Sequence, residues 1–383
     1  MSRSLVVGGA VVVSCVTLAL AEIRSAEAEE PPAVAATSAP VPESPAAVPA
    51  PGGSAWDASR ARGIEWLLKQ QRSDGGWGAA SHTSDVATTV IAARALLRDA
   101  GGTDKHEASI AEGLGYVIAA IDSAADGPYL DTPRNTQPQR KLGAYVDTHM
   151  AALLLGDVVE KIDEEPLRSR VKLAYAKVLR KVEQTQQVDG SFEATGWAPV
   201  LSSSMAVQSL LTAAQQGQSV DVEVLARNAS YQAQMGSSVD FASAGGSAGV
   251  ELYGLAATAS ASRTYESSVA MIAGVTGGGN PDMGDDLESN VATAKRTLRR
   301  DSSVVRGFGS MGGEEMLAYM MISDTLAQDG GEDWTQWDQK IGTHLASIQN
   351  ADGSWSGHHC ITSTVFVTAA ALVTLGAGDH ASG

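Results

Sequence analysis

Gln349-Asn-Ala-Asp352-Gly-Ser-Trp355 is the stretch of sequence that decides the fold, because its pattern occurs twice more in the chain. Gln71-Arg-Ser-Asp74-Gly-Gly-Trp77 and Gln186-Gln-Val-Asp189-Gly-Ser-Phe192 share the same order of Gln, Asp-Gly, a small residue and an aromatic residue. Each copy follows an amphipathic segment and precedes an apolar, alanine-rich one. Such self-similarity is typical of repeat proteins, so we predict a unit made of a helix, a turn and a buried helix.

Each residue type in this pattern has a physical role in such a turn. The Asp-Gly pair provides turn chemistry and a position that tolerates a positive φ angle. The aromatic side chain can bury against the neighbouring hairpin, and the Gln side chain can bond backbone groups that are left free at a helix end. We therefore expect the three copies to adopt one local structure.

Three degenerate copies lie between the clear ones, and each also precedes an apolar segment. The six marker aromatic residues are then Trp77, Tyr129, Phe192, Phe241, Phe308 and Trp355. Their separations of 52, 63, 49, 67 and 47 residues suit one pair of helices per repeat. We predict an all-α fold, an α/α toroid of six helical hairpins whose alanine-rich helices lie inside, because closure would bury both ends of the array.

The Gln-x-x-Asp-Gly-Ser-Trp pattern resembles the repeat of squalene and oxidosqualene cyclases and that of protein prenyltransferase β subunits. The resemblance covers about Trp56 to Gly376, and several copies occur in register. The chain is similar to exported bacterial proteins that carry prenyltransferase or squalene oxidase repeats of the terpenoid cyclase type. The resemblance implies the architecture of this family.

The catalytic motifs of these enzymes do not carry over to this chain. Triterpene cyclases use Asp-x-Asp-Asp, whereas Asp282-Met-Gly-Asp285-Asp286 has a different spacing. Protein prenyltransferases bind zinc with Asp-x-Cys and a distant His, whereas Cys360 follows two histidines. The resemblance therefore leaves the reaction open, including whether the protein is an enzyme.

The N-terminal segment indicates export. Arg3 gives a positive start, and the mostly apolar run 5–21 is short for a membrane span, so we predict that residues 1–28 are a signal peptide or an N-terminal anchor. A lipobox-like sequence ends at Cys15, which leaves a lipid-anchored form open. We expect the protein in the periplasm, in the cell envelope or outside the cell.

The remaining domain boundaries follow from composition. Residues 29–54 are rich in Pro and Ala and have almost nothing large to bury, so we predict a disordered linker. We assign residues 55–378 to the toroid and 379–383 to a tail. Cys360 is the only cysteine beyond the targeting segment, so it can form no disulfide within the mature chain.

The formal net charge of -17 bears on the partners of the protein. Nucleic acid and an anionic membrane surface would both repel it, so we expect no nucleic acid and membrane contact only through an uncleaved or lipidated N-terminus. A small hydrophobic ligand at the mouth of the toroid is a candidate partner, and protein partners stay open.

Polar residues at the starts of the alanine-rich helices are the candidates for chemistry, because these starts would meet at the mouth of a toroid. We select Asp147, His149, Glu251 and Cys360 as candidate catalytic residues. Cys360 would be a nucleophile activated by a neighbouring His. Nitrogen, oxygen and sulfur ligands of this kind also suit zinc, and the candidate metal ligands are His358, His359, Cys360, Asp147 and His149.

The same residues also have structural interpretations. Asp85 and Asp147 lie where helix N-caps are expected, and Glu314 and Glu315 favour a helix start electrostatically. Cys360 alone can be inert packing. Three functions stay open: a metal-assisted enzyme acting on an isoprenoid or other hydrophobic substrate, a non-catalytic ligand- or protein-binding toroid of the cell envelope, and a glycan-active α/α-barrel enzyme.

Overall fold

The computed structural model describes residues 56–99, 105–193, 195–236, 250–276, 284–300 and 311–382. All of these belong to one compact unit, residues 49–383. Within this part of the chain the regular elements are helices, and the only β feature is an isolated bridge between Ala80 and Thr83. The predicted all-α class is confirmed, whereas the predicted signal peptide and linker lie outside the described residues.

The described helices fall into two sets that alternate along the chain. One set is largely buried and contains α2 (Val86–Leu97), α6 (Val146–Val158), α8 (Pro199–Gln215), α10 (Glu251–Thr276), α12 (Gly313–Asp329) and α14 (Thr364–Leu375). The other set contains α1 (Asp57–Leu68), α4 (Glu107–Asp122), α7 (Leu167–Glu183), α9 (Val222–Gly236), α11 (Gly284–Arg300) and α13 (Gly331–Ser347). Two short helices, α5 (Gln137–Leu142) and α15 (Ala377–Ser382), complete the description.

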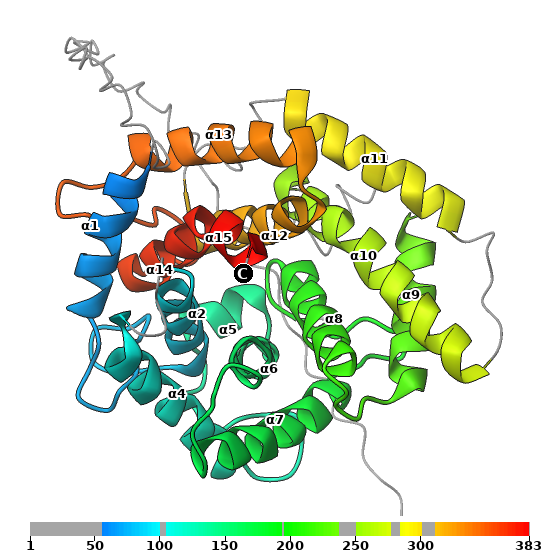
Figure 1. Ribbon diagram of the computed structural model, residues 1–383, viewed down its shortest axis with the longest axis horizontal. Coiled ribbons are helices and arrows are strands. Elements are labelled where there is room, and N and C mark those ends of the chain that lie inside the picture. The colour runs from blue at the N-terminus through cyan, green and yellow to red at the C-terminus, as the bar shows by residue number, and fades with distance from the viewer. Residues whose placement is uncertain are drawn as a thin grey trace, which may run out of the picture. The chain divides into compact units, whose positions relative to one another are not determined.

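The buried helices pack against one another in chain order. α2 contacts α6, α6 contacts α8, and the series continues through α10 and α12 to α14, which packs back on α2. Figure 1 shows α2, α6, α8, α12 and α14 inside the other set, with α1, α4, α7 and α13 on the outside. Most of the buried apolar side chains therefore belong to one continuous core.

The composition of the two sets explains this arrangement. Almost every residue of α2 and α14 is buried, in agreement with sequences that are apolar on all sides. By contrast, α7 alternates basic residues with a single buried stripe that contains Val171, Tyr175 and Val178. A helix with one apolar stripe must keep its other face toward water, so it covers the core rather than crossing it.

The three clear repeats adopt one turn, as predicted. Gly75, Gly190 and Gly353 have φ angles of 82°, 94° and 94°, which L side chains rarely adopt. A Cβ atom on Gly75 would lie 2.6 Å from the carbonyl oxygen of Glu112, and one on Gly353 would lie 2.6 Å from that of Arg62. The glycines are therefore required both for the turn and for close approach to the next outer helix.

The Gln residue of each repeat bonds two backbone carbonyls. Gln349 Nε2 donates to Gly353 O and to Ser59 O, at 2.8 Å in both cases. Gln71 Nε2 bonds Gly75 O and Ser109 O in the same way. Each of these side chains thus joins its own turn to the following outer helix, which confirms the predicted use of the Gln amide.

The marker aromatic residues divide into two groups. Trp77, Phe192 and Trp355 are fully buried, and the indole Nε1 of Trp355 donates to Leu345 O at 2.8 Å. Tyr129 is 40% exposed, so the prediction that it lies in the core is wrong. This copy keeps the Asp-Gly pair, as Asp126-Gly127, but has Ser123 in place of the Gln. A Cβ atom added to Gly127 would have no atom within 4 Å, so this turn lacks the close packing on an outer helix that the clear repeats show. Phe241 and Phe308 lie outside the described residues.

The C-terminal residues extend the helical structure. Residues assigned to a tail from position 379 onward are helical as far as Ser382, within α15, which packs on α12 and α14. Across the described ranges, no helix combines the length and the apolar character that crossing a membrane requires.

Candidate functional site

The buried helices bring polar side chains together at both of their ends. Asp147 at the start of α6 accepts a hydrogen bond from Ala87 N at the start of α2. At the opposite ends of the same two helices, Arg94 donates to Asp157. The starts of these helices therefore form one side of the core and their ends form the other, and the two sides are described in turn.

Asp85 and Asp147 both cap α2. Asp85 is its N-cap residue and accepts hydrogen bonds from Thr88 N at 2.8 Å and from Ala79 N at 2.7 Å. Asp147 Oδ1 accepts from Ala87 N at 2.9 Å, and its Oδ2 accepts from Gln139 Nε2 at 2.7 Å. The capping interpretation is confirmed for Asp85, while Asp147 caps the neighbouring helix rather than its own.

The surroundings of Asp147 favour its neutral form. Its side chain is buried, and burial followed by repulsion from Asp85 raises the pKa of Asp147 to about 7. Burial also raises the pKa of Asp85, against the hydrogen bonds that lower it. Two neighbouring buried carboxyl groups thus share the start of α2.

His149 is a buried histidine with both ring nitrogens bonded. Nδ1 lies 2.8 Å from Ser202 Oγ, and Nε2 lies 2.9 Å from Thr185 Oγ1. Thr185 already donates its hydroxyl proton to Val182 O, so it accepts from Nε2–H, and Ser202 then donates to Nδ1. Burial lowers the pKa of His149 to about 3, so this imidazole is neutral and joins α6 to α8.

Glu314 and Glu315 form a second buried pair at the start of α12, and both are fully buried. Glu315 accepts from Tyr253 Oη at 2.6 Å and from Gly312 N at 2.9 Å. Glu314 Oε2 accepts from Ile361 N at 3.2 Å, whereas its Oε1 accepts no hydrogen bond from a described nitrogen or oxygen donor. Burial and the charge of Glu315 raise the pKa of Glu314.

The Gly-His-His-Cys segment is a loop ahead of α14 rather than part of a helix. His358 N donates to Met311 O at 2.7 Å, and Gly313 N donates to Ile361 O at 3.0 Å, so the loop is fixed to the start of α12. His359 Nε2 lies 3.5 Å from Glu315 Oε2, while the His358 side chain is exposed. Of the two histidines, His359 is the one beside the buried carboxyl pair.

Cys360 lies beside Glu314 and has a φ angle of 53°, which is unusual for a residue other than glycine. Burial and the Glu314 carboxylate raise the pKa of the Cys360 thiol to about 11. The thiol is therefore protonated at neutral pH. Its surroundings work against the activation that we expected for a nucleophile.

The predicted site residues thus lie in separate places. Asp147 and His149 have different partners, Glu251 is exposed at the start of α10, and Cys360 adjoins Glu314. Among the described residues, no three His, Cys, Asp or Glu side chains come together in a way that could hold a metal ion. The two glutamates at the start of α12, which we interpreted as electrostatic helix-start residues, are the carboxylates that contact the Gly-His-His-Cys loop, Glu315 at His359 and Glu314 at Cys360.

A cavity lies at the opposite side, between the ends of the buried helices. Its volume is about 300 Å³. Side chains from α2, α6, α8, α10 and α12 line it, and most are polar or charged. They include Arg94, Arg98, Asp157, Lys161, Ser204, Gln208, Thr212, Gln215, Ser260, Asp324, Thr325 and Gln328, with Leu153, Met205, Met320 and Met321 as apolar members.

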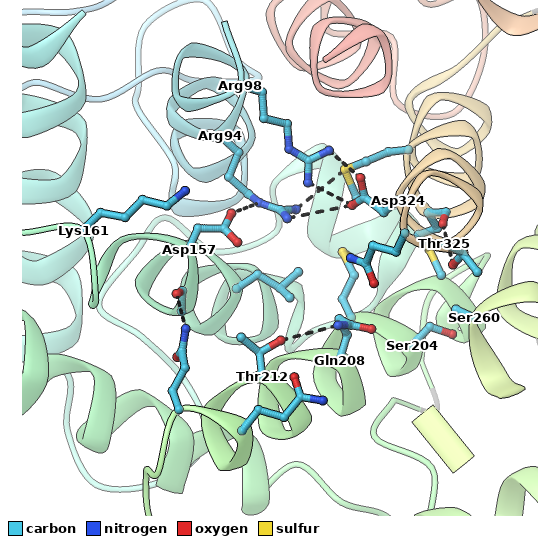
Figure 2. Close-up of a pocket in the computed structure, with 18 residues that line it drawn as sticks. Arg94, Arg98, Asp157, Lys161, Ser204, Gln208, Thr212, Ser260, Asp324 and Thr325 are labelled. Carbon is cyan, nitrogen blue, oxygen red and sulfur yellow. Dashed lines mark hydrogen bonds and ion pairs between the residues drawn. The ribbon is translucent and has the colours of Figure 1, made fainter. Parts of the chain in front are cut away.

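The two arginines and two aspartates of this cavity form a network of ion pairs, which Figure 2 shows with Lys161 apart from it. Arg94 Nε donates to Asp157 Oδ2 at 2.6 Å, and an Nη atom of Arg94 lies 4.0 Å from Asp324 Oδ2. Arg98 binds both oxygens of Asp324, at 2.5 and 3.0 Å. This bidentate geometry fixes Asp324, whereas only the Nε of Arg94 makes a short hydrogen bond to a carboxylate.

The lining carries an excess of one positive charge, because three cationic side chains face two carboxylates. Lys161 is exposed at the edge of the cavity and forms no ion pair with a described residue. The remaining lining provides hydroxyl and amide groups from Ser204, Thr212 and Gln208. These side chains can bind a ligand that has an anionic group at one end and hydroxyl or amide groups at its other end.

We did not select these cavity residues from the sequence. The available signal was Arg94 within an otherwise apolar, alanine-rich segment, since a buried Arg needs a partner. Its partners, Asp157 and Asp324, are distant in sequence by 63 and 230 positions, so no local pattern could indicate them.

Comparison with known proteins adds no family to this description. No family model matches the chain, and no curated protein sequence matches it either. The proposals that follow therefore rest on the contacts and charges of the described residues.

Proposed function

We propose that this protein is a closed α/α toroid of helical hairpins that binds a small polar molecule carrying an anionic group. The contact order supports closure, because each buried helix packs on the next and α14 packs on α2. The alternating outer helices support one hairpin per buried helix. The proposed ligand site is the cavity between the ends of α2, α6, α8 and α12.

The polar lining of the cavity is the observation that carries this proposal. If an isoprenoid or other hydrophobic substrate filled the cavity, the charged side chains of the lining would lose their contacts with water and gain no polar partner in return. Such burial is unfavourable. A ligand with a carboxylate or phosphate group would instead accept hydrogen bonds from Lys161 and from the Nη groups of Arg94. The lining therefore favours the binding toroid over the enzyme with a hydrophobic substrate.

The composition of the lining also favours binding over catalysis. Among the described residues that line it there is no His, Cys or Tyr side chain that could serve as a nucleophile or transfer a proton near neutral pH. Asp157 and Asp324 are both engaged by arginines. We propose the cell envelope as the setting, in line with the signal peptide expected at residues 1–28.

Binding can be tested by thermal unfolding and calorimetry with defined probes. Ligand that binds only the folded state raises the unfolding temperature, so we expect glucose 6-phosphate and inorganic phosphate to raise it and glucose to have little effect. Lys161→Gln and Gln208→Leu should weaken binding of the phosphorylated probe about tenfold each, a change that corresponds to about 1.4 kcal/mol.

Lys172→Gln is the matched control, because Lys172 is exposed on α7 and outside the cavity. Its affinity for the probe should equal that of the wild type. Two results would contradict the proposed site. One is equal affinity for glucose and glucose 6-phosphate, and the other is an equal loss of affinity for the phosphorylated probe in Lys172→Gln and in Lys161→Gln.

A further inference from the structure

We propose that a second site, at the starts of the buried helices, binds a short acidic saccharide. The site is an open hollow of about 530 Å³, called the rim hollow below. It lies at the opposite ends of the helices from the cavity lined by Arg94, Arg98 and Lys161, which is called the central cavity below. The second site therefore does not depend on the proposed function. Its lining residues are Tyr129, Arg134, Asn135, Gln139, Arg140, Ala144, Thr195 and Gly196.

The rim hollow carries local positive charge on a strongly acidic protein. The formal net charge is -17, yet Arg134, Arg140 and Lys141 lie close together in sequence around the rim hollow. None of these three side chains forms an ion pair with a described residue. Arg134 is near enough to the buried Asp147 to lower the pKa of that carboxyl, but it makes no ion pair with it or with another described carboxylate. The three cations can therefore pair with a carboxylate of a ligand.

The two arginines of the rim hollow are held in place by contacts within the protein. The Arg134 guanidinium lies 4.2 Å from the centroid of the Tyr129 ring, and one of its nitrogens donates to Leu130 O at 3.3 Å. Arg140 donates to Asn135 O on the same turn. Side chains that are already held in place lose less conformational entropy when a ligand binds.

Two aromatic side chains are exposed beside the hollow. Tyr129 is 40% exposed and Trp197 is 45% exposed, in contrast to the buried aromatic residues of the clear repeats. Lys141 Nζ lies 5.7 Å from the centroid of the Trp197 ring. Amphipathic rings beside this hollow suit the apolar C–H face of a sugar, while its hydroxyl groups stay hydrated or bonded.

The floor of the rim hollow is rigid. The backbone N–H groups of Trp197 and Ala198 donate to Lys141 O at 2.7 and 2.8 Å. A Cβ atom on Gly196 would lie 2.6 Å from Gly143 N, so the two backbone segments are in close contact. Glu193 accepts from Tyr145 N at 2.9 Å beneath them. The turn that carries Trp197 is therefore fixed to the end of α5.

A short acidic saccharide fits these features better than other anions. A long polyanion such as nucleic acid would extend beyond the hollow and be repelled by the protein, whose formal net charge is -17. A short ligand would contact only the basic hollow. A bare anion would not use the exposed rings of Tyr129 and Trp197. The Asn135 amide adds a group that can bond sugar hydroxyls.

Calorimetry with three probes tests this site directly in the full-length protein. The probes are trigalacturonic acid, neutral maltotriose and a short oligothymidylate. We expect measurable binding of trigalacturonic acid, at least tenfold weaker binding of maltotriose, and no binding of the oligonucleotide at physiological ionic strength. The affinity for the acidic probe should fall as salt concentration rises.

Variants of exposed residues make the test independent of folding. Arg134→Gln combined with Arg140→Gln, and separately Trp197→Ala, should each weaken binding of trigalacturonic acid at least tenfold. Leu173→Ala, at a side chain that is 74% exposed on α7, and Lys172→Gln are the controls and should bind as the wild type does. Circular dichroism should show the same helical content for all of them.

Three results would overturn the proposal. They are equal affinity for the acidic and neutral trisaccharides, preferential binding of the oligonucleotide, and an equal loss of affinity for trigalacturonic acid in the control variants and in Trp197→Ala. The central-cavity variant Lys161→Gln should leave trigalacturonic acid binding unchanged, so failure at one site is distinguishable from failure at the other.

Discussion

Asp147 and His149 illustrate how burial determines the charge of single residues in this protein. They are two positions apart on α6, and burial favours the neutral form of both side chains. Their effects on stability run in opposite directions with pH. A carboxyl with a raised pKa stabilises the fold at low pH, whereas a histidine with a lowered pKa destabilises the fold when the unfolded chain can take up a proton.

Asp147→Asn should therefore change the pH dependence of unfolding. The pKa of Asp147 is about 7 in the folded protein and near 3.8 when unperturbed, so its stabilising contribution is complete below about pH 4 and is lost as pH rises through 7. Relative to the wild type, the variant should gain on the order of 4 kcal/mol between these limits. Urea unfolding at pH 5, 6, 7 and 8 measures the difference, and a constant difference would contradict the raised pKa.

Several of these residue-scale features were predictable, and others were not. The N-cap at Asp85 follows from its place before an apolar segment. The partners of His149 do not, because Ser202 and Thr185 belong to other helices and hydroxyl groups have no sequence signature as partners. The partner of Glu315, Tyr253, was likewise beyond the sequence, since it comes from α10.

At the scale of elements, the repeated turn is the unit that specifies the fold. Its glycine accepts a positive φ angle, its Gln bonds the next outer helix, and its aromatic residue enters the core. The sequence predicted this unit well because all of its interactions lie within one hairpin or between neighbours. Where the pattern degenerates, as at Tyr129, the aromatic side chain is exposed and the prediction failed.

Gly353→Ala and Gly217→Ala separate two reasons for glycine in these turns. Gly217 has a φ angle of 72° and no atom within 4 Å of an added Cβ, whereas at Gly353 that atom would lie 2.6 Å from Arg62 O. We expect a loss of about 1 kcal/mol at Gly217 from backbone strain and about 2–4 kcal/mol at Gly353, where overpacking adds to it. Equal losses in chemical unfolding would show that close approach to α1 does not matter.

At the scale of the whole molecule, ion pairs join helices that are far apart in sequence. Arg98 binds Asp324 near the end of α12 and donates to Val373 O in α14 at 3.2 Å. These contacts link the first buried helix to the last two. These ion pairs bring together the polar side chains that line the cavity at the ends of the buried helices. Because the paired residues are far apart in sequence, the sequence indicated candidate functional residues only at the helix starts.

Arg98→Met should destabilise the protein by about 3–5 kcal/mol, because it leaves Asp324 partly buried without its main partner. Combining it with Asp324→Leu removes both charges and should recover a large part of the loss. Chemical unfolding of the single and double variants completes the cycle. A double variant no more stable than Arg98→Met would mean that packing at Arg98, rather than its charge, stabilises the ends of these helices.

The contact between the first and last described helices has a consequence for chain connectivity. Arg60 in α1 pairs with Asp379 in α15, and α1 also packs on α14. A short peptide linker could therefore join residue 382 to residue 56, and new termini could be opened at the exposed turn near Gly217, between α8 and α9. Such a circular permutant should keep the same core and bind the same ligands, because no helix would have to change its neighbours.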